Sequence, residues 1–196
     1  MDTSDAAPDS RASTATAVGT FGLALLLVSL SVLFAASMVG YLIVRVRSDQ
    51  WPPTGAPNLP IGLWVSTVVL LISSGTMHQA LRSARAGRQR ALAAAMLVTT
   101  LLGLVSMISQ AWCWSHLIGR NLGAGSNLYG FTFYLLTGLH AAHVIGGLIV
   151  LVLVTVRAYR GDYGIENHRP VMHCAMYWHF LDVVWVIIFL VLQIAS

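Results

Sequence analysis

Charged residues are scarce in this chain of 196 residues. Only 9% of its residues are Asp, Glu, Lys or Arg, whereas 57% are hydrophobic, and the mean hydropathy is +0.74. Lysine is absent, so every basic residue is an arginine. Soluble domains do not have this composition, and the short segments between the hydrophobic stretches leave no room for a separate soluble domain. The chain is therefore predicted to be an integral membrane protein, and the chemistry of a soluble enzyme is excluded.

Cysteine is also rare, since the chain contains only Cys113 and Cys174. On the topology predicted below these residues lie near opposite membrane faces, so we expect no disulfide between them. No CxxC or CxxCH motif and no paired Cys/His spacing suggests structural zinc or attached haem. A phosphate-binding loop, a dinucleotide fingerprint and a nucleophile elbow are missing as well. The sequence thus predicts no catalytic residue, no cofactor-binding residue and no metal site in this chain.

Five hydrophobic stretches are long enough to cross a bilayer, which takes about 20 residues in a helix. They cover residues 18–44, 61–81, 91–117, 129–156 and 174–195. The first is not a signal peptide, because the residues before it are acidic rather than basic and the apolar run is longer than a signal core. Residues 1–17 are predicted to be a disordered tail, and residues 18–196 one membrane domain. The predicted fold class is an all-α bundle of five transmembrane helices.

The connector after the first stretch, residues 51–60 (WPPTGAPNLP), is rich in proline. Proline prevents a helix here and favours an extended crossing. Trp51 is placed where an interfacial indole is expected.

Arginine is distributed unevenly over the two sides of this topology. With five spans, the side of the N-terminus holds Arg11, Arg82, Arg85, Arg88, Arg90, Arg157, Arg160 and Arg169, and the other side holds Arg45, Arg47 and Arg120. Because positive residues favour the cytoplasmic side, the N-terminus is predicted to be cytoplasmic and the C-terminus periplasmic. The net charge of +4 reflects this topology, and no nucleic-acid partner is expected.

Two histidines lie inside the fourth stretch, in the segment TGLHAAHVIGG at residues 137–147. His140 and His143 are three residues apart and share one helical face. They either pack against a neighbouring helix through hydrogen bonds or bind a metal or haem. Haem would need a second helix for its opposite ligand, and His179 lies at a depth that differs from that of His143 by about 13 Å. This mismatch argues against a shared centre.

The last stretch contains His179 and Asp182, and Asp182 is the only acidic residue in any predicted span. A charged group in hydrocarbon costs about 2.5–3.5 kcal/mol on insertion scales. His140, His143, His179 and Asp182 are therefore predicted to be buried polar contacts, structural or proton-related, rather than lipid-facing groups. Asp182 is either protonated or paired with His179 or a cation of another helix or subunit. The pair is interpreted as an interhelical clamp or a proton relay.

The segments at 137–147 and 177–185 (YWHFLDVVW) together resemble subunit III of the haem-copper terminal oxidases, the cytochrome c oxidase and quinol oxidase family. The two motifs stand in the family's order, on the fourth and fifth of five spans. WPP at 51–53, VSTVVLLISSG at 65–75 and QAWCW at 110–114 are similar to further stretches of the family. The resemblance covers residues 18–195 and corresponds to a short five-helix bacterial form.

The resemblance implies a non-catalytic accessory subunit in a bacterial inner (cytoplasmic) membrane. Its expected partners are oxidase subunit I directly, subunit II and a small subunit IV, together with phospholipids. Haem and copper are expected in these partner subunits and not in this chain. Family members stabilise subunit I, hold lipids and support proton uptake during aerobic electron transport with cytochrome c or quinol as donor.

The chain also departs from the family, which usually has glutamates inside the earlier helices. Leu30, Gln110 and Cys113 stand in the corresponding region, so no carboxylate remains within a span before Asp182. Three alternatives therefore stay open: an accessory protein of a nitric oxide reductase, a divergent membrane cytochrome, and a small transporter. A transporter would typically show internal repeats or helices broken by Gly or Pro, and the prolines all lie outside the predicted spans.

Overall fold

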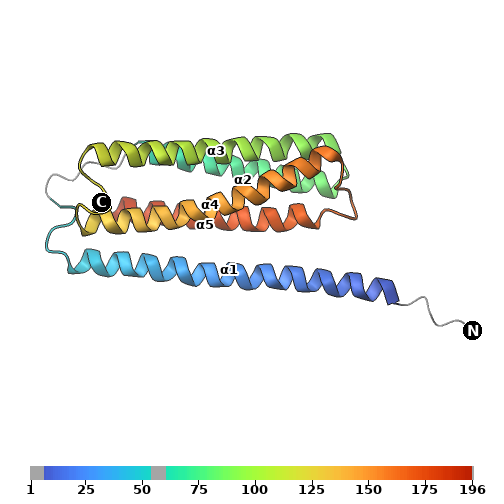
Figure 1. Ribbon diagram of the computed structural model, residues 1–196, viewed down its shortest axis with the longest axis horizontal. Helices are drawn as coiled ribbons and strands as arrows, with labels where there is room; N and C mark the ends of the chain where they lie inside the picture. The colour runs from blue at the N-terminus through green and yellow to red at the C-terminus, as the bar shows by residue number, and fades with distance from the viewer. Residues whose placement is uncertain (1–6, 54–60, 196) are drawn as a thin grey trace, which may run out of the picture.

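The computed structural model describes residues 7–53 and 61–195, with side chains described for residues 18–53 and 61–194. These residues form five α-helices (Figure 1): α1 (Ala7–Arg47), α2 (Gly62–Arg85), α3 (Gln89–Gly119), α4 (Leu128–Arg160) and α5 (Arg169–Ala195). Each predicted stretch falls within one helix or overlaps it almost completely. The prediction of an all-helical fold is confirmed.

Helices α2 to α5 form a closed four-helix bundle. α2 packs against α3 and α5, and α4 also packs against α3 and α5, so each helix has two neighbours around the ring. α1 lies outside the ring and contacts only α4 and α5 among the described helices. Figure 1 shows α1 running along one side of the bundle, with the two chain ends at opposite ends of the molecule.

Short connections make sequence neighbours antiparallel. α2 and α3 are joined by three residues, in which Gly87 has a φ of 65° that a side chain would strain. Asn127 caps α4 by accepting a hydrogen bond from the Gly130 amide at 2.7 Å. Gly161 ends α4 in the left-handed conformation, with a φ of 84°. These signals stop and restart the helices at the two ends of the bundle.

α1 begins before the hydrophobic stretch that it contains. The structure describes a helix from Ala7, so residues 7–17 are helical rather than the unstructured extension that we expected. Residues 1–6 lie outside the described part of the chain. The segment after Pro8 contains neither glycine nor proline up to Val18, and proline is tolerated in the first turn of a helix. Local helix propensity therefore extends α1 beyond its apolar span, which begins at Val18.

Four of the described helices are long and apolar enough to cross a membrane: Val18–Arg47, Gln89–Gly119, Leu128–Arg160 and Arg169–Ile194. α2 coincides with the second predicted span but is not among them. Its sequence carries many serine and threonine residues, and His78 and Gln79 add polarity near its end. That α2 crosses the membrane, and that the N-terminus is cytoplasmic, stay predictions.

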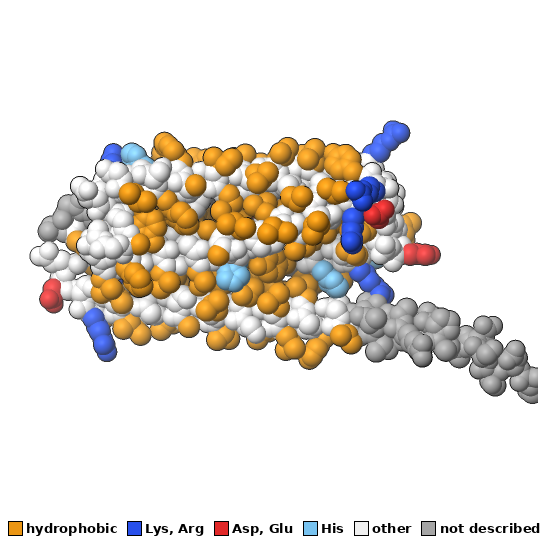
Figure 2. Space-filling view, in the orientation of Figure 1, with side chains coloured by type: hydrophobic (Ala, Val, Ile, Leu, Met, Phe, Trp, Pro, Cys, Tyr) orange, Lys and Arg blue, Asp and Glu red, His pale blue; other side chains and the backbone are white. Residues whose placement is uncertain are grey.

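The surface agrees with a membrane environment. In Figure 2, hydrophobic side chains are spread over the visible face between its two ends, and basic side chains lie at those ends. Only 11% of the most apolar window of α1 is buried inside the structure, against 44–50% for the three other apolar helices. α1 therefore presents most of its apolar surface outward.

Trp51, which is predicted to be an interfacial indole, also contacts two of the helices. It is half-buried, and its ring lies 5.5 Å from that of Tyr41 in α1 and 5.0 Å from that of Tyr129 in α4, both edge-to-face. Such aromatic pairs stabilise beyond their buried area, so Trp51 links α1 to the bundle. Most of the connector predicted to be extended, residues 54–60, lies outside the described residues.

Two glycines let the bundle helices approach closely. A Cβ added at Gly62 of α2 would collide with the Sγ of Cys113 in α3. A Cβ at Gly103 of α3 would lie 2.8 Å from Leu148 of α4 and 2.8 Å from Trp178 of α5. Small residues at helix contacts are typical of packing in membranes, where dispersion and hydrogen bonds replace the hydrophobic effect.

Candidate functional site

Several polar side chains of the bundle are paired between helices. α5 donates from two buried indoles to hydroxyls of α2: Trp178 Nε1 to Ser73 Oγ at 2.8 Å, and Trp185 Nε1 to Thr67 Oγ1 at 3.0 Å. Inside the membrane such bonds are each worth about 0.6–2 kcal/mol. The two indoles are seven residues apart and therefore lie on one face of α5, and this face attaches α5 to α2.

Hydroxyl and indole pairs also connect α3 with its two neighbours. Thr76 and Thr99 hydroxyls lie 2.8 Å apart between α2 and α3. Thr100 and Thr155 hydroxyls lie 3.0 Å apart between α3 and α4. Trp114 Nε1 donates to Thr137 Oγ1 at 3.2 Å in the same helix pair. The ring of helices is therefore held together by polar contacts as well as by packing.

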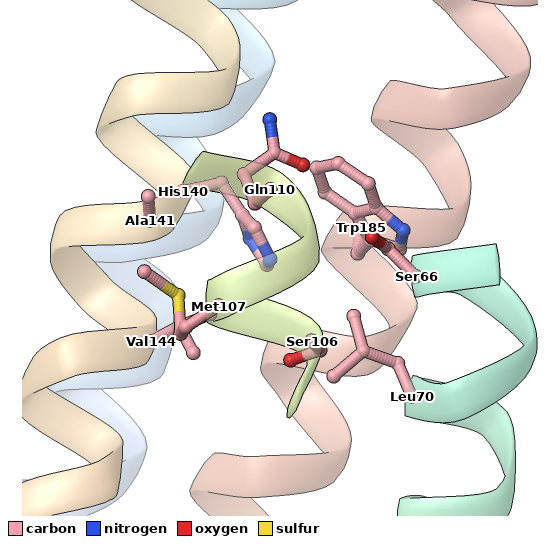
Figure 3. Close-up of a pocket in the computed structure, with 9 residues that line it drawn as sticks. All are labelled: Ser66, Leu70, Ser106, Met107, Gln110, His140, Ala141, Val144 and Trp185. Atoms are coloured by element: carbon pink, nitrogen blue, oxygen red, sulfur yellow. The ribbon is translucent and has the colours of Figure 1, made fainter. Parts of the chain in front are cut away.

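His140 points into the centre of the bundle. The residue is only 4% exposed, and its ring centroid lies 4.9 Å from that of Trp185. Figure 3 shows the imidazole between α4 and the side chains of Gln110 and Trp185, above Ser106 and Met107. Nδ1 of His140 and both amide atoms of Gln110 are buried and have no hydrogen-bond partner among the described residues.

His143 lies on the side of α4 that faces α1, although it is only three residues from His140. Its side chain is half-buried, and its ring meets that of Phe34 edge-to-face at 5.2 Å. Nδ1 lies 2.7 Å from the carbonyl oxygen of Leu139, one turn earlier. Both histidines therefore lie near Phe34 of α1, whose ring centroid is 6.4 Å from that of His140, and His140 also lies against Trp185 of α5.

His179 and Asp182 lie where α5 contacts α2. His179 Nδ1 is 2.7 Å from Ser74 Oγ, and the imidazole side chain is 35% exposed. Asp182 is 5% exposed, and its Oδ2 lies 4.0 Å from His179 Nδ1. That separation exceeds a hydrogen bond, and Oδ2 has no hydrogen-bond partner among the described residues. The closest ionisable neighbour of Asp182 is thus in its own helix, as the spacing of three residues suggested.

Neither Gln110 nor Thr67 was predicted to be a partner of these groups. Gln110 was noted only in QAWCW and as a departure from the family's glutamates, and Thr67 only as a small residue of the segment at 65–75. Their position on the inner faces of α3 and α2 was the available signal, because a polar residue on a buried face needs a partner.

Within residues 7–53 and 61–195, no group of three or more His, Cys, Asp or Glu is arranged to hold a metal ion. Cys113 and Cys174 are both buried free thiols. The polar groups that the structure brings together are therefore pairs between helices, without a larger ligand cluster in the described part of the chain.

This fold and these contacts define a class, that of helical membrane proteins whose polar side chains join the helices of one bundle. A sequence model of the family described as "Cytochrome c oxidase subunit III" matches residues 9–196. The chain is 34% identical to "Cytochrome c oxidase subunit 3" of Synechocystis sp. over 176 residues, which cover 89% of this chain and 74% of the relative. It is 30% identical to the protein of that name in Thermostichus vulcanus, covering 89% of this chain and 86% of the relative. It is 33% identical to "Probable cytochrome c oxidase subunit 3" of Mycobacterium leprae, covering 81% and 79%. The chain belongs to the cytochrome c oxidase subunit III family.

Proposed function

We propose that this chain is a non-catalytic structural subunit of a proton-pumping haem-copper respiratory oxidase in a bacterial inner membrane. The observation that carries the proposal is the pairing of three polar side chains of α5 with hydroxyl groups of α2. Trp178 with Ser73, Trp185 with Thr67 and His179 with Ser74 each join α5 to α2. Groups used in this way fix a scaffold, whereas catalysis needs groups that converge on a substrate. Haem and copper then belong to the partner subunits.

Phospholipid binding is the second part of the proposal. A groove of about 470 Å³ lies between α1, α4 and α5, lined by apolar side chains that include Leu23, Leu26, Val150 and Val154. A second groove of about 420 Å³ lies between α1 and α4 nearer the other end of α1. Both match acyl chains in polarity, because apolar side chains make up most of their lining. Acyl chains in these grooves would attach α1 more firmly to the bundle.

Direct contact with the catalytic subunit I is the third part of the proposal, and the exposed apolar surface supports it. The outward face of α1 needs cover by lipid or protein, and an oxidase complex offers both. Stabilisation of subunit I and support of its proton uptake stay predictions that rest on the family. The predicted candidates for a proton-related role are His179 and Asp182 of α5 together with His140 and His143 of α4, and the His179 side chain is 35% exposed.

Affinity purification through a tag on this chain tests the proposal. The membrane is solubilised in a mild detergent, and the captured material is analysed for proteins, haem and copper. We expect subunits that carry haem and copper, together with oxygen consumption by the captured complex. Capture of haem without copper would favour the nitric oxide reductase alternative, and capture of the chain alone would contradict the assignment.

Replacement of Asp182 by leucine tests the role of the α2–α5 contact in assembly. The substitution removes a buried carboxyl oxygen that has no partner in the described residues, so the chain itself should stay folded. His179 loses its acidic neighbour, and we expect less active oxidase to be recovered after detergent extraction. Asp162→Leu, in the exposed turn after α4, is the matched control. Equal recovery from both variants would refute this role.

A further inference from the structure

Two residues with unpaired buried polar atoms line the same small cavity in the centre of the bundle. The unpaired atoms are the two amide atoms of Gln110 in α3 and Nδ1 of His140 in α4, none with a hydrogen-bond partner in the part of the chain that the structure describes. Gln110 is 5% exposed and His140 4%. A buried polar group left unpaired costs about 1–3 kcal/mol. Such groups in native proteins usually bind ordered water.

The cavity has the size of one water molecule. Its volume is about 10 Å³, measured as the space open to the centre of a water-sized sphere. A single water requires roughly 10–15 Å³ by this measure. Leu70, Met107 and Val144 close the remaining walls, as Figure 3 shows, so a larger ligand does not fit.

Two serine hydroxyls complete the polar lining. Ser66 Oγ donates to the Gly62 carbonyl at 2.9 Å, and Ser106 Oγ donates to the Gly103 carbonyl at 2.8 Å. Each donation uses the single hydroxyl proton, so both oxygens remain able to accept a hydrogen bond. The cavity therefore offers donors and acceptors from α2, α3 and α4.

We propose that this cavity binds one water molecule that bridges the Gln110 amide to His140 Nδ1. The water accepts from one of these groups and donates to the other, and its second proton reaches the hydroxyl oxygen of Ser66 or Ser106. The bridge links α3 to α4 where neither side chain reaches the other directly. It thereby supplies the interhelical polar contact that threonine pairs supply elsewhere in the bundle.

A density map of the full chain at a resolution that shows ordered water is the direct test. The chain is examined in a lipid nanodisc or in its complex. We expect one peak at about 2.6–3.2 Å from His140 Nδ1 and from a Gln110 amide atom. An empty cavity, or a direct contact between the amide and the imidazole, would overturn the proposal.

A double-mutant cycle tests the energetic link in the same chain. Gln110→Leu and His140→Phe should each lower the melting temperature. The decrease in the double variant should be clearly smaller than the sum of the two single decreases, since either change alone destroys the bridge. Gln110→Leu combined with Thr155→Val is the control, because the Thr155 hydroxyl pairs with Thr100; its shifts should add. Additive decreases for Gln110→Leu and His140→Phe would contradict the proposal. If a variant does not fold, the density map alone tests whether the water is present.

Discussion

Gly103 is a position where the structure predicts a large effect from a small change. It lies in α3, where α4 and α5 both approach. The Cβ of an alanine there would lie 2.8 Å from Leu148 Cδ2 and 2.8 Å from Trp178 Cη2. Carbon atoms attract each other best at about 3.5–4.0 Å. Both neighbours would therefore have to move by close to 1 Å.

Trp178 is poorly able to move. It is 2% exposed, and its indole nitrogen donates to Ser73 of α2 at 2.8 Å. A shift of the ring would lengthen this bond as well as disturb the packing. Overpacking of this kind costs about 1–3 kcal/mol, and alanine returns up to about 1 kcal/mol through its higher helix propensity. We expect Gly103→Ala to destabilise the chain by about 1–2 kcal/mol.

The two buried free thiols, Cys113 and Cys174, provide the assay. A dye that becomes fluorescent on reaction with thiols reports unfolding of the purified chain in detergent as the temperature rises. The expected loss corresponds to a melting temperature lower by about 2–8 °C. Gly138→Ala in α4 is the control, because a Cβ there meets no atom within 4 Å. If Gly103→Ala melts at or above the temperature of the unmodified chain, the helix packing described above is wrong.

Two further predictions use the same purified chain. Trp178→Phe removes the hydrogen bond to Ser73 and leaves a small cavity, so it should destabilise the chain by about 1–3 kcal/mol. Trp112→Phe is the control, because Trp112 is 59% exposed, and it should leave the thiol-dye melting curve unchanged. Equal effects of the two substitutions would contradict the attachment of α5 to α2. The purified chain, separated from partner subunits, should show no Soret band in its absorbance spectrum, and a band that travels with the chain alone would count against an accessory role.

Much of the architecture could be predicted because membrane insertion makes strong demands on sequence. Every backbone polar group in hydrocarbon must be paired, so a long apolar stretch there has to be a helix. Composition thus predicted an all-helical fold, and the described helices agree with all five stretches. The start of α1 was missed, because a segment rich in serine, alanine and threonine reads as disordered even when no residue within it stops a helix.

The candidate site was only partly predictable. Sequence spacing placed His140 with His143 and His179 with Asp182, since residues three apart are neighbours on a helix. It could not tell that both histidines lie near Phe34 of α1, or that His140 also lies against Trp185 of α5. These neighbours depend on the rotation of α4 about its axis, which is set by how the whole bundle packs.

The sequence by itself determined that this chain is a set of apolar helices with a few polar groups among them, because hydropathy and helical periodicity are local properties. Only the tertiary structure decided which helix each polar group meets. It closed α2 to α5 into a ring, left α1 outside, and brought Gln110 and His140 to one cavity. Those outcomes depend on the mutual fit of side chains far apart in the chain, such as Gly103 with Trp178, which no local pattern records.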